Sequence, residues 1–272
     1  MTVAVQAGAA THAGCVRSDN QDHVRSAPPV FAVADGMGGH AGGEVASALA
    51  LGAFDRFDGA GVVDPGSVLV AVREANTEIL RQAEANPDLA GLGSTVVGVV
   101  LARKDGADAI AAFNVGDSRV YRLRHGALEL ISTDHSVVAE LVASGRLAPG
   151  DASTHPDRHV ITRALGVEPS VEVDTWLLVP EPGDRFLVCS DGLTNEVGGD
   201  DLAAQLEADR SPEEVAGALV ALALDRGASD NVTALVVDVV GVDAPAGPHQ
   251  DGDGTSEVDE DTLRPPSARA TG

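Results

Sequence analysis

The 272 residues, 44% of them apolar, are enough for one large domain or two small ones with a substantial buried core. The formal net charge of −24, with a single lysine at Lys104, argues against nucleic acid and anionic membranes as partners, because both bind clustered Lys and Arg. Only two cysteines, no signal-peptide pattern at the start and no apolar run of membrane-helix length predict a soluble, cytoplasmic protein, which we expect to be a monomer.

Residues 1–240 predict strands and helices that alternate unevenly. Short β-branched and apolar runs predict strands at 30–34, 94–102, 109–116, 118–124, 185–190 and 232–240. Apolar residues three and four positions apart predict helices at 44–57, 68–86, 136–145 and 211–227. The last helix begins with a capping box, in which Ser211 and Pro212 precede Glu214. A hairpin signal at His125-Gly126 favours an antiparallel α+β layer structure over parallel winding.

The composition changes near Gly241. The stretch 241–272 is rich in Gly, Pro and Asp, and its seven acids and two arginines give it a net charge of −5, which leaves −19 for residues 1–240. A segment with so few large apolar residues cannot bury enough surface to offset the entropy cost of ordering. We therefore expect a folded domain at 1–240 and a disordered acidic tail at 241–272, for which plain solvation is a simpler interpretation than regulation.

Two stretches of the chain share one pattern, an apolar run that stops at an acid followed by glycine. FAVADGMGG contains Asp35-Gly36, and FLVCSDGLTN contains Asp191-Gly192. An Asp-Gly pair alone is typical of an ordinary turn. Three further aspartates stand next to predicted strands or near the start of the chain, namely Asp230, Asp117 and Asp22. This recurrence favours a shared site over independent turns.

Convergence of these carboxylates would require a cation. Two carboxylates a few ångströms apart cannot both ionise cheaply without a positive charge between them. Oxygen ligands, with no Cys or His pair at zinc spacing, select Mg²⁺ or Mn²⁺ over Zn²⁺. Gly36 suits such a site, because a residue without a side chain lets its carbonyl approach an ion closely. We expect adjacent central strands to deliver Asp35 and Asp191 to one cation cluster.

One glycine-rich stretch and one arginine bear on phosphate binding. GMGGHAGGE lacks the Gly-Lys-Ser/Thr ending of a P-loop, so close backbone approach at the start of a helix near Gly43 explains it better. Arg17, five residues before Asp22, suits a bidentate grip on a phosphoryl group. Without further context, an ordinary surface salt bridge is the simpler interpretation of this arginine.

Eight ordered blocks within residues 1–240 resemble the metal-dependent Ser/Thr protein phosphatases of the type 2C, or PPM, family, and the bacterial stand-alone kind most of all. The blocks are RSDNQD (17–22), VADGMGGHAGGE (33–44), GSTVV (93–97), NVGDSRVYRLR (114–124), TDHS (133–136), HPDRHVITRALG (155–166), LVCSDGLTN (187–195) and SDNVTALVV (229–237). Any single block is weak evidence, but their common order is hard to obtain by chance.

The resemblance implies a four-layer αββα sandwich, in which helices flank two antiparallel β-sheets. It also implies two tightly bound Mn²⁺ or Mg²⁺ ions at one edge of the sandwich, with a weaker third. Asp35 would bridge the two ions, Asp191 and Asp230 would complete the first site, and the Gly36 carbonyl would join Asp35 at the second. Asp117, together with Asp191, would hold the third ion.

The resemblance further implies a metal-dependent serine/threonine phosphatase reaction. Two ions about 3.5–4 Å apart lower the pKa of a bridging water, and the hydroxide attacks phosphorus in line without a phosphoenzyme. Arg17 would bind the substrate phosphate, and Asp22 would act beside the ions. The segment 137–159 corresponds to a mobile flap next to the site. Phosphorylated proteins, including autophosphorylated Ser/Thr kinases, would be the substrates.

The sequence departs from the family pattern at two places near the site. Gln21 stands where the family often has Glu; its amide oxygen can still coordinate, or Asp22 can act through metal-bound water, which leaves the affinity of the second metal open. Met37 stands where animal members have a His proposed as the acid for the leaving group. His40 and His155 are alternatives for that acid, and each is also explained as structural or solvent-exposed.

These departures leave an alternative open, a catalytically weak, phosphatase-like signalling or binding module. Such a module would keep its metals for structure alone. The presence of Asp35, Asp191 and Asp230 argues against this alternative, because a pure binding module has no need of all three.

Overall fold

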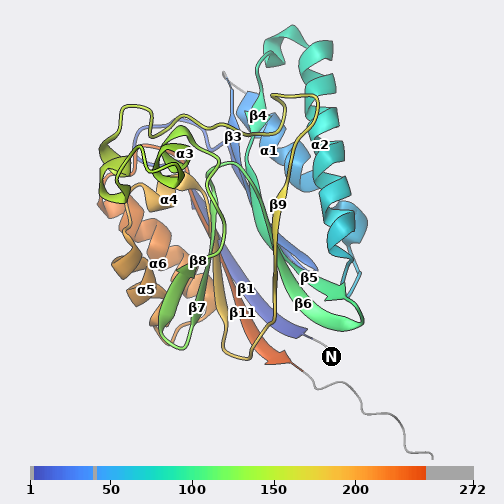
Figure 1. The fold of residues 1–272 in the computed structure, drawn as a ribbon, viewed down its shortest axis with the longest axis vertical. Helices are drawn as coiled ribbons and strands as arrows, with labels where there is room; N and C mark the ends of the chain where they lie inside the picture. Colours follow the sequence, from blue (N-terminus) through green and yellow to red (C-terminus); the bar gives the residue numbers. More distant parts are fainter. Residues whose placement is uncertain (1–2, 39–41, 243–272) are drawn as a thin grey trace, which may run out of the picture.

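Two antiparallel sheets face each other in the computed structural model, which describes residues 3–38 and 42–242 (Figure 1). The first sheet has the strand order β1 (Val3–His12), β11 (Val232–Val242), β10 (Arg185–Cys189), β7 (Arg119–Arg124) and β8 (Ala127–Leu130). The second sheet has the order β2 (Asp22–Ala27), β3 (Val30–Met37), β5 (Val96–Lys104), β6 (Ala107–Val115) and β9 (Asp174–Leu178), and β4 (Gly93–Ser94) pairs with β3 outside this path.

Helices cover the outer face of each sheet. The second sheet packs against α1 (Gly42–Gly52) and α2 (Pro65–Ala85), and the first against α5 (Gly199–Glu207) and α6 (Pro212–Asp225) (Figure 1). The connections contain the short helices α3 (Val137–Ala143) and α4 (Asp191–Thr194) and the 3-10 turns η1 (Asp55–Phe57), η2 (Pro87–Leu89) and η3 (Pro149–Thr154). The predicted α+β fold, a four-layer αββα sandwich, is confirmed.

Apolar side chains fill all three spaces between the four layers, and β3 shows how one strand serves two of them. Val30, Ala32 and Ala34 face α1 and α2, whereas Phe31 and Val33 face the opposite sheet. Because both faces of the strand are buried, the sequence has a continuous apolar run there and not an alternation of polar and apolar residues.

The predicted elements are present with shifted ends. The six predicted strands correspond to β3, β5, β6, β7, β10 and β11, with β4 taking the start of the second. The helix predicted at 44–57 ends at Gly52, and η1 follows it. The capping box of α6 is present, and His125 and Gly126 both have positive φ, as a tight hairpin turn requires.

Strands β1, β2 and β9 and helix α5 were not predicted. The sequence of β1, VAVQAGAATH, is dominated by small residues and lacks a strong strand signal. The structure explains one of these small residues, Gly8, because a Cβ there would lie 2.2 Å from the backbone nitrogen of Glu213. Glycine therefore allows α6 to pack directly on β1.

The last described strand runs past the predicted domain boundary at residue 240. Strand β11 extends to Val242, two residues past the predicted boundary, and the rest of the predicted tail lies outside the described residues, as does His40. Within the described ranges, no helix combines the length and the apolar character needed to cross a bilayer.

Candidate metal centre

A cavity of about 810 Å³ opens at the end of the sandwich where β3 and β10 finish. Its lining contains Arg17, Asp35, Asp117, Asp191 and Asp230, which are five of the seven predicted site residues. The other two, Asp22 and Gly36, stand next to this lining in the fold. The structure therefore brings together acids that are nearly 200 residues apart in the sequence.

Asp35 and Asp191 come from strands in opposite sheets. Asp35 lies on β3 of the second sheet, and Asp191 follows β10 of the first sheet as the first residue of α4. The prediction that adjacent strands deliver them is wrong, because a sequence shows where a strand ends but not which sheet the strand joins. The acids meet across the gap between the two sheets.

The GSTVV block holds the backbone of Asp35. The Asp35 N–H donates to Thr95 Oγ1 at 3.0 Å, and its carbonyl accepts from the Thr95 N–H at 2.9 Å and from Ser94 Oγ at 3.0 Å. Thr95 Oγ1 also lies 2.8 Å from Ser118 Oγ, and Ser118 follows Asp117 directly. Thr95 thus fixes the segments that carry Asp35 and Asp117 to each other.

Asp22 connects the two sheets from a buried position. It lies on β2, opposite Asp35 in the strand register, and is 5% exposed. Its Oδ2 accepts hydrogen bonds from Ser190 Oγ at 2.7 Å and from Thr233 Oγ1 at 2.6 Å, both from the first sheet's side. Its buried Oδ1 has no hydrogen-bond partner among the described residues. A carboxylate oxygen in this state fits a place beside a cation or its water.

Burial and mutual repulsion raise the pKa of the acids in the cluster. Burial, followed by the charges of Asp22 and Asp191, raises the pKa of Asp35 well above its usual range. Burial raises the pKa of Asp22 to about 7, and burial with the Asp191 charge raises the pKa of Asp117 to about 7. Burial also raises the pKa of Asp191. The cluster therefore holds negative charge that a divalent cation would stabilise.

The donor set fits Mg²⁺ or Mn²⁺, since every candidate ligand is a carboxylate or carbonyl oxygen. As they stand, no three His, Cys, Asp or Glu side chains of the described residues converge closely enough to form a complete coordination sphere. One cause is that Arg17 Nη2 donates to Asp230 Oδ2 at 2.9 Å. Both side chains are about half exposed, so this ion pair is weak and a divalent ion can displace it.

Gly36 is required by the packing of α1. A Cβ on Gly36 would lie 2.0 Å from the Gly43 carbonyl oxygen, which confirms the close backbone approach predicted for this stretch. A Cβ on Gly43 would lie 2.5 Å from Gln21 Oε1 and 2.7 Å from the Gly36 carbonyl oxygen. The Gln21 amide oxygen and the Gly36 carbonyl oxygen therefore approach the same point at the start of α1.

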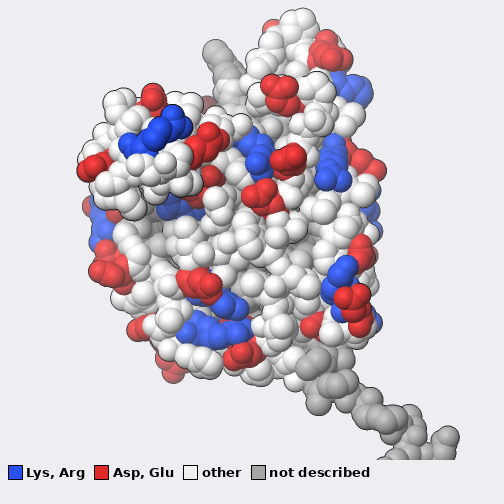
Figure 2. Space-filling view, viewed as in Figure 1, with Lys and Arg blue, Asp and Glu red and all other residues white. Residues whose placement is uncertain are grey.

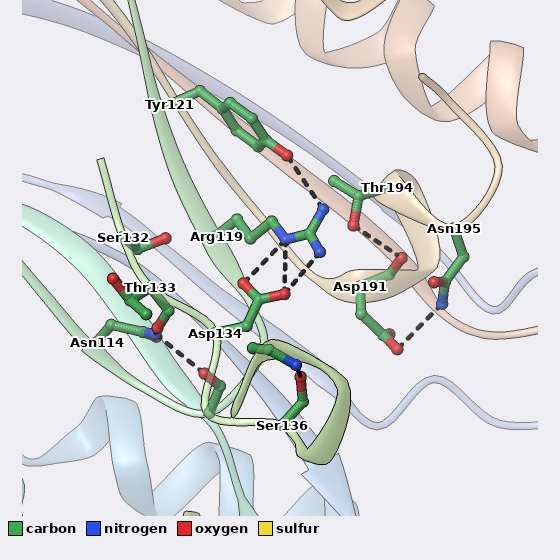
Figure 3. A network of polar contacts seen from close by, with 12 residues as sticks. Asn114, Arg119, Tyr121, Ser132, Thr133, Asp134, Ser136, Asp191, Thr194 and Asn195 are labelled. Carbon is green, nitrogen blue, oxygen red and sulfur yellow. Dashed lines mark hydrogen bonds and ion pairs between the residues drawn. The ribbon is translucent and has the colours of Figure 1, made fainter. Parts of the chain in front are cut away.

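A balanced ion pair borders Asp117. Arg119 donates from Nε to Asp134 Oδ1 at 2.9 Å and from Nη2 to Asp134 Oδ2 at 2.6 Å, and its Nη1 donates to Tyr121 Oη at 3.2 Å. Figure 3 shows this pair together with Asp191, and all three residues line the cavity. Because Arg119 compensates Asp134, this acid adds no uncompensated negative charge to the cavity.

The segment 137–159, called the flap segment below, forms one wall of the cavity. Its lining residues include Arg158 and His159, which the sequence analysis did not single out. Their only signal was their place in the HPDRHVITRALG block. His155, a candidate acid from the sequence, is not among the lining residues of the described chain; its Nδ1 accepts a hydrogen bond from the Asp157 N–H at 3.1 Å.

Comparisons with known proteins point to one family. Residues 9–219 match the family described as protein phosphatase 2C. The serine/threonine protein phosphatase PstP of Mycobacterium tuberculosis is 40% identical over 252 residues, which cover 89% of this chain and 46% of that protein. The serine/threonine phosphatase stp of Listeria welshimeri is 36% identical over 243 residues, covering 84% and 93%. A solved structure of the PstP catalytic domain in complex with two manganese ions has a TM-score of 0.77 at 37% identity, covering 88% and 100%.

The chain belongs to the protein phosphatase 2C family, as the ordered sequence blocks predicted. It spans about half the length of the PstP relative and nearly all of the Listeria relative. The family match and the sandwich fold therefore define a bacterial-type PPM phosphatase domain.

Proposed function

We propose that the chain is a Mn²⁺- or Mg²⁺-dependent phosphatase that hydrolyses phosphoserine and phosphothreonine in proteins, with residues 1–240 as its catalytic domain. The observation that carries this proposal is the convergence of Asp35, Asp117, Asp191 and Asp230 on one cavity that also contains Arg17. The names of the relatives and the manganese complex of a structural neighbour support the same activity.

Asp35, Asp191, Asp230 and the Gly36 carbonyl would hold two ions, and Asp117 with Asp191 would hold a weaker third. When bound, such ions activate water and stabilise the charge of the phosphoryl oxygens. The protein's part is to hold the ligands in place, and the hydrogen bonds between the Asp35 backbone and Thr95 and Ser94 fix the segment that carries this carboxylate.

Arg17 and Asp22 serve the reacting groups in different ways. Only Nη2 of Arg17 contacts Asp230, and the side chain is 59% exposed, so the remaining N–H groups can donate to a phosphate in the cavity. Asp22 can hold a proton at Oδ1, which has no other partner among the described residues, because burial raises the pKa of this carboxyl to about 7.

Phosphorylated proteins, with Ser/Thr kinases among them, are the proposed substrates, and the cytoplasm is the proposed location. Both cysteines are free, one exposed and one buried, which suits a reducing compartment. The alternative of a catalytically weak module has less support, because four of the five predicted acids line one cavity and the Gln21 amide oxygen lies near the Gly36 carbonyl.

A turnover assay tests the proposal. The protein should hydrolyse a phosphothreonine peptide and an aryl phosphate with Mn²⁺, lose this activity with a chelator, and lose it as Asp35→Ala or Asp191→Ala. A matched control is Asp201→Asn, which removes a surface ion pair with Arg226. Activity that survives chelation would reject the proposal.

A further inference from the structure

His135 is a buried residue outside the predicted site, and its ring lies between two parts of the cavity wall. It is 6% exposed and stands just before the flap segment. The function proposed above assigns it no task. Its two ring nitrogens contact different segments, one the turn that precedes Asp117 and the other the residues that follow the flap segment.

The first ring nitrogen faces the turn that carries Asp117. His135 Nδ1 accepts a hydrogen bond from the Gly116 N–H at 2.9 Å, and the His135 N–H donates to the Gly116 carbonyl at 2.9 Å. Gly116 has a φ of +113°, and a Cβ there would lie 2.5 Å from Thr95 Cγ2, so only glycine fits. Asn114 Nδ2 bridges the same turn to the Thr133 carbonyl. Asp117 thus follows a turn that is fixed to residues 133–135.

The second ring nitrogen faces the far end of the flap segment. His135 Nε2 lies 3.3 Å from Asp174 Oδ2 and 2.7 Å from Arg163 Nη1, and Arg163 Nη1 donates to Asp174 Oδ1 at 2.7 Å. Asp174 belongs to the edge strand β9 of the second sheet. Arg163 follows the flap segment in the chain.

The tautomer of His135 follows from these contacts. Nδ1 accepts the Gly116 N–H and carries no proton, so in the neutral ring the proton is on Nε2. Nε2–H and Arg163 Nη1 are then both donors, and their short approach is not a hydrogen bond between them. The Asp174 carboxylate accepts from both, and it is the group that holds these two donors together.

Backbone hydrogen bonds close the base of the flap segment at the same place. The Thr162 N–H donates to the His135 carbonyl at 2.8 Å, and the Val137 N–H donates to the Val160 carbonyl at 2.9 Å. Between these bonds, Ser136 and Ile161 form an isolated bridge, and both line the cavity. The residues that hold the flap base are therefore also the cavity wall.

We propose that His135, held by Asp174 and Arg163, is a positioning residue that joins the Asp117 turn to the base of the flap segment, so that the third-ion ligand and the cavity wall are placed by one group. This inference rests on the proposed function, since Asp117 is a metal ligand only there. The Nδ1 side of the ring positions Asp117, and the Nε2 side closes the flap base.

The two sides can be separated by substitution. His135→Asn keeps an acceptor near the Nδ1 position for the Gly116 N–H and loses the donor toward Asp174, whereas His135→Ala loses both. Asp174→Asn keeps the ring and removes the charge that holds the two donors. Glu129→Gln is the matched control, because it makes the same acid-to-amide change in an arginine-paired residue of the β7–β8 hairpin, away from the flap base.

Two measurements on the full chain with Mn²⁺ test the proposal, after thermal unfolding has shown which variants fold. Trypsin cleavage at Arg146 and Arg158 should be about fivefold faster in Asp174→Asn and His135→Asn and unchanged in Glu129→Gln. Titration with Mn²⁺ should show the weakest site about tenfold weaker in His135→Ala, with Asp117→Asn as the reference for loss of that site. His135→Asn should keep this affinity.

Steady-state kinetics on a phosphothreonine peptide give a third readout. His135→Asn should raise KM with little change in kcat, and His135→Ala should also lower kcat. The inference is overturned if Asp174→Asn is cleaved like the wild type, or if His135→Asn and His135→Ala behave alike in both metal binding and cleavage. A wild-type protein that binds no Mn²⁺ would instead overturn the proposed function, and the cleavage rates would still decide whether His135 closes the flap base.

Discussion

Several acids lie near each end of β10, but only at one end do most of them lack an arginine partner among the described residues. Where β10 begins, a cavity of about 590 Å³ is lined by Asp184, Arg185 and Asp238. Arg185 binds Asp238 through Nε and Nη2 at 2.6 and 2.7 Å, and Arg124 grips the fully buried Asp184 in the same bidentate way. Where β10 ends, Asp35, Asp117 and Asp191 have no arginine partner among the described residues.

The difference shows that buried acids alone do not mark a metal site. At the end where β10 begins, called the far end below, guanidinium groups neutralise the carboxylates. Their remaining N–H groups donate to backbone carbonyls, so the arrangement is structural. At the cavity end the pKa of each acid in the buried cluster is raised, because burial and like charges act without a cation. Paired charges are also visible on the face of the molecule in Figure 2, where basic side chains (blue) lie next to acidic ones (red).

The largest expected effect is at Asp191. Asp191→Ala removes the carboxylate that the proposed function assigns to both the first and the third ion, and turnover should fall by more than about 10³-fold while the fold is kept. The measurement is kcat/KM on a phosphothreonine peptide with saturating Mn²⁺, with circular dichroism as the check on folding. A variant that keeps a tenth of the wild-type rate would remove Asp191 from the machinery.

A smaller loss is expected at Arg17, because its proposed role is to bind the phosphate and not the ions. Arg17→Ala should lower kcat/KM by about 10–100-fold, the value of a charge-assisted hydrogen-bond pair, and Arg17→Lys should recover part of it. Calorimetric Mn²⁺ titration should be unchanged or slightly tighter, since Asp230 loses its competing partner. Weakened Mn²⁺ binding in Arg17→Ala would contradict this division of labour.

A substitution at the far end should change the stability of the protein and not its activity. Arg185→Ala leaves Asp238 unpaired and removes donors from the carbonyls of Leu206, Ala208 and Arg210, so unfolding free energy should fall by about 2–4 kcal/mol. Denaturant unfolding measures the loss, and KM for the peptide should stay within error of the wild type. A changed KM would mean that the two ends are coupled.

The smallest effect is the pH dependence of the ion-free protein. Asp22 and Asp117 have a folded pKa of about 7, above the usual value of 3.8, so folding favours their protonated forms. The stability that this contributes is complete below pH 3.8 and is lost as pH rises from there through 7, so Tm should fall by roughly 5–10 °C between pH 5 and pH 8. Mn²⁺ should reduce this fall, as should Asp22→Asn. A Tm in chelator that rises from pH 5 to pH 8 would show that the cluster is not repulsive.

The sequence predicted several buried strands and the acids at their ends for a definite physical reason. Strands buried on both faces give long apolar runs, and Asp35 and Asp191 stand where such runs stop. The sheet that each strand joins could not be predicted in this way, because the pattern of residues along a strand does not show which strands lie beside it. Strand β1 was missed because its small residues, such as Gly8, serve the approach of α6.

The contacts between residues around the site could not be predicted from the sequence either. Arg119 and Asp134 are 15 residues apart, and His135 and Arg163 are 28 apart, in stretches without regular spacing. Their pairing depends on how the loops close over the ends of the sheets. Sequence blocks identified these residues as members of a family pattern, and only the fold shows which of them contact each other.

Titration of the chelated protein with Mn²⁺, followed by calorimetry, tests the central claim that Asp35, Asp191 and Asp230, which line one cavity, bind divalent ions that neutralise them. We expect at least two ions per chain in the wild type, loss of the tighter binding in Asp35→Asn and Asp191→Asn, and no change in Asp238→Asn at the far end. Binding of no ion, or equal binding by all four proteins, would contradict the account.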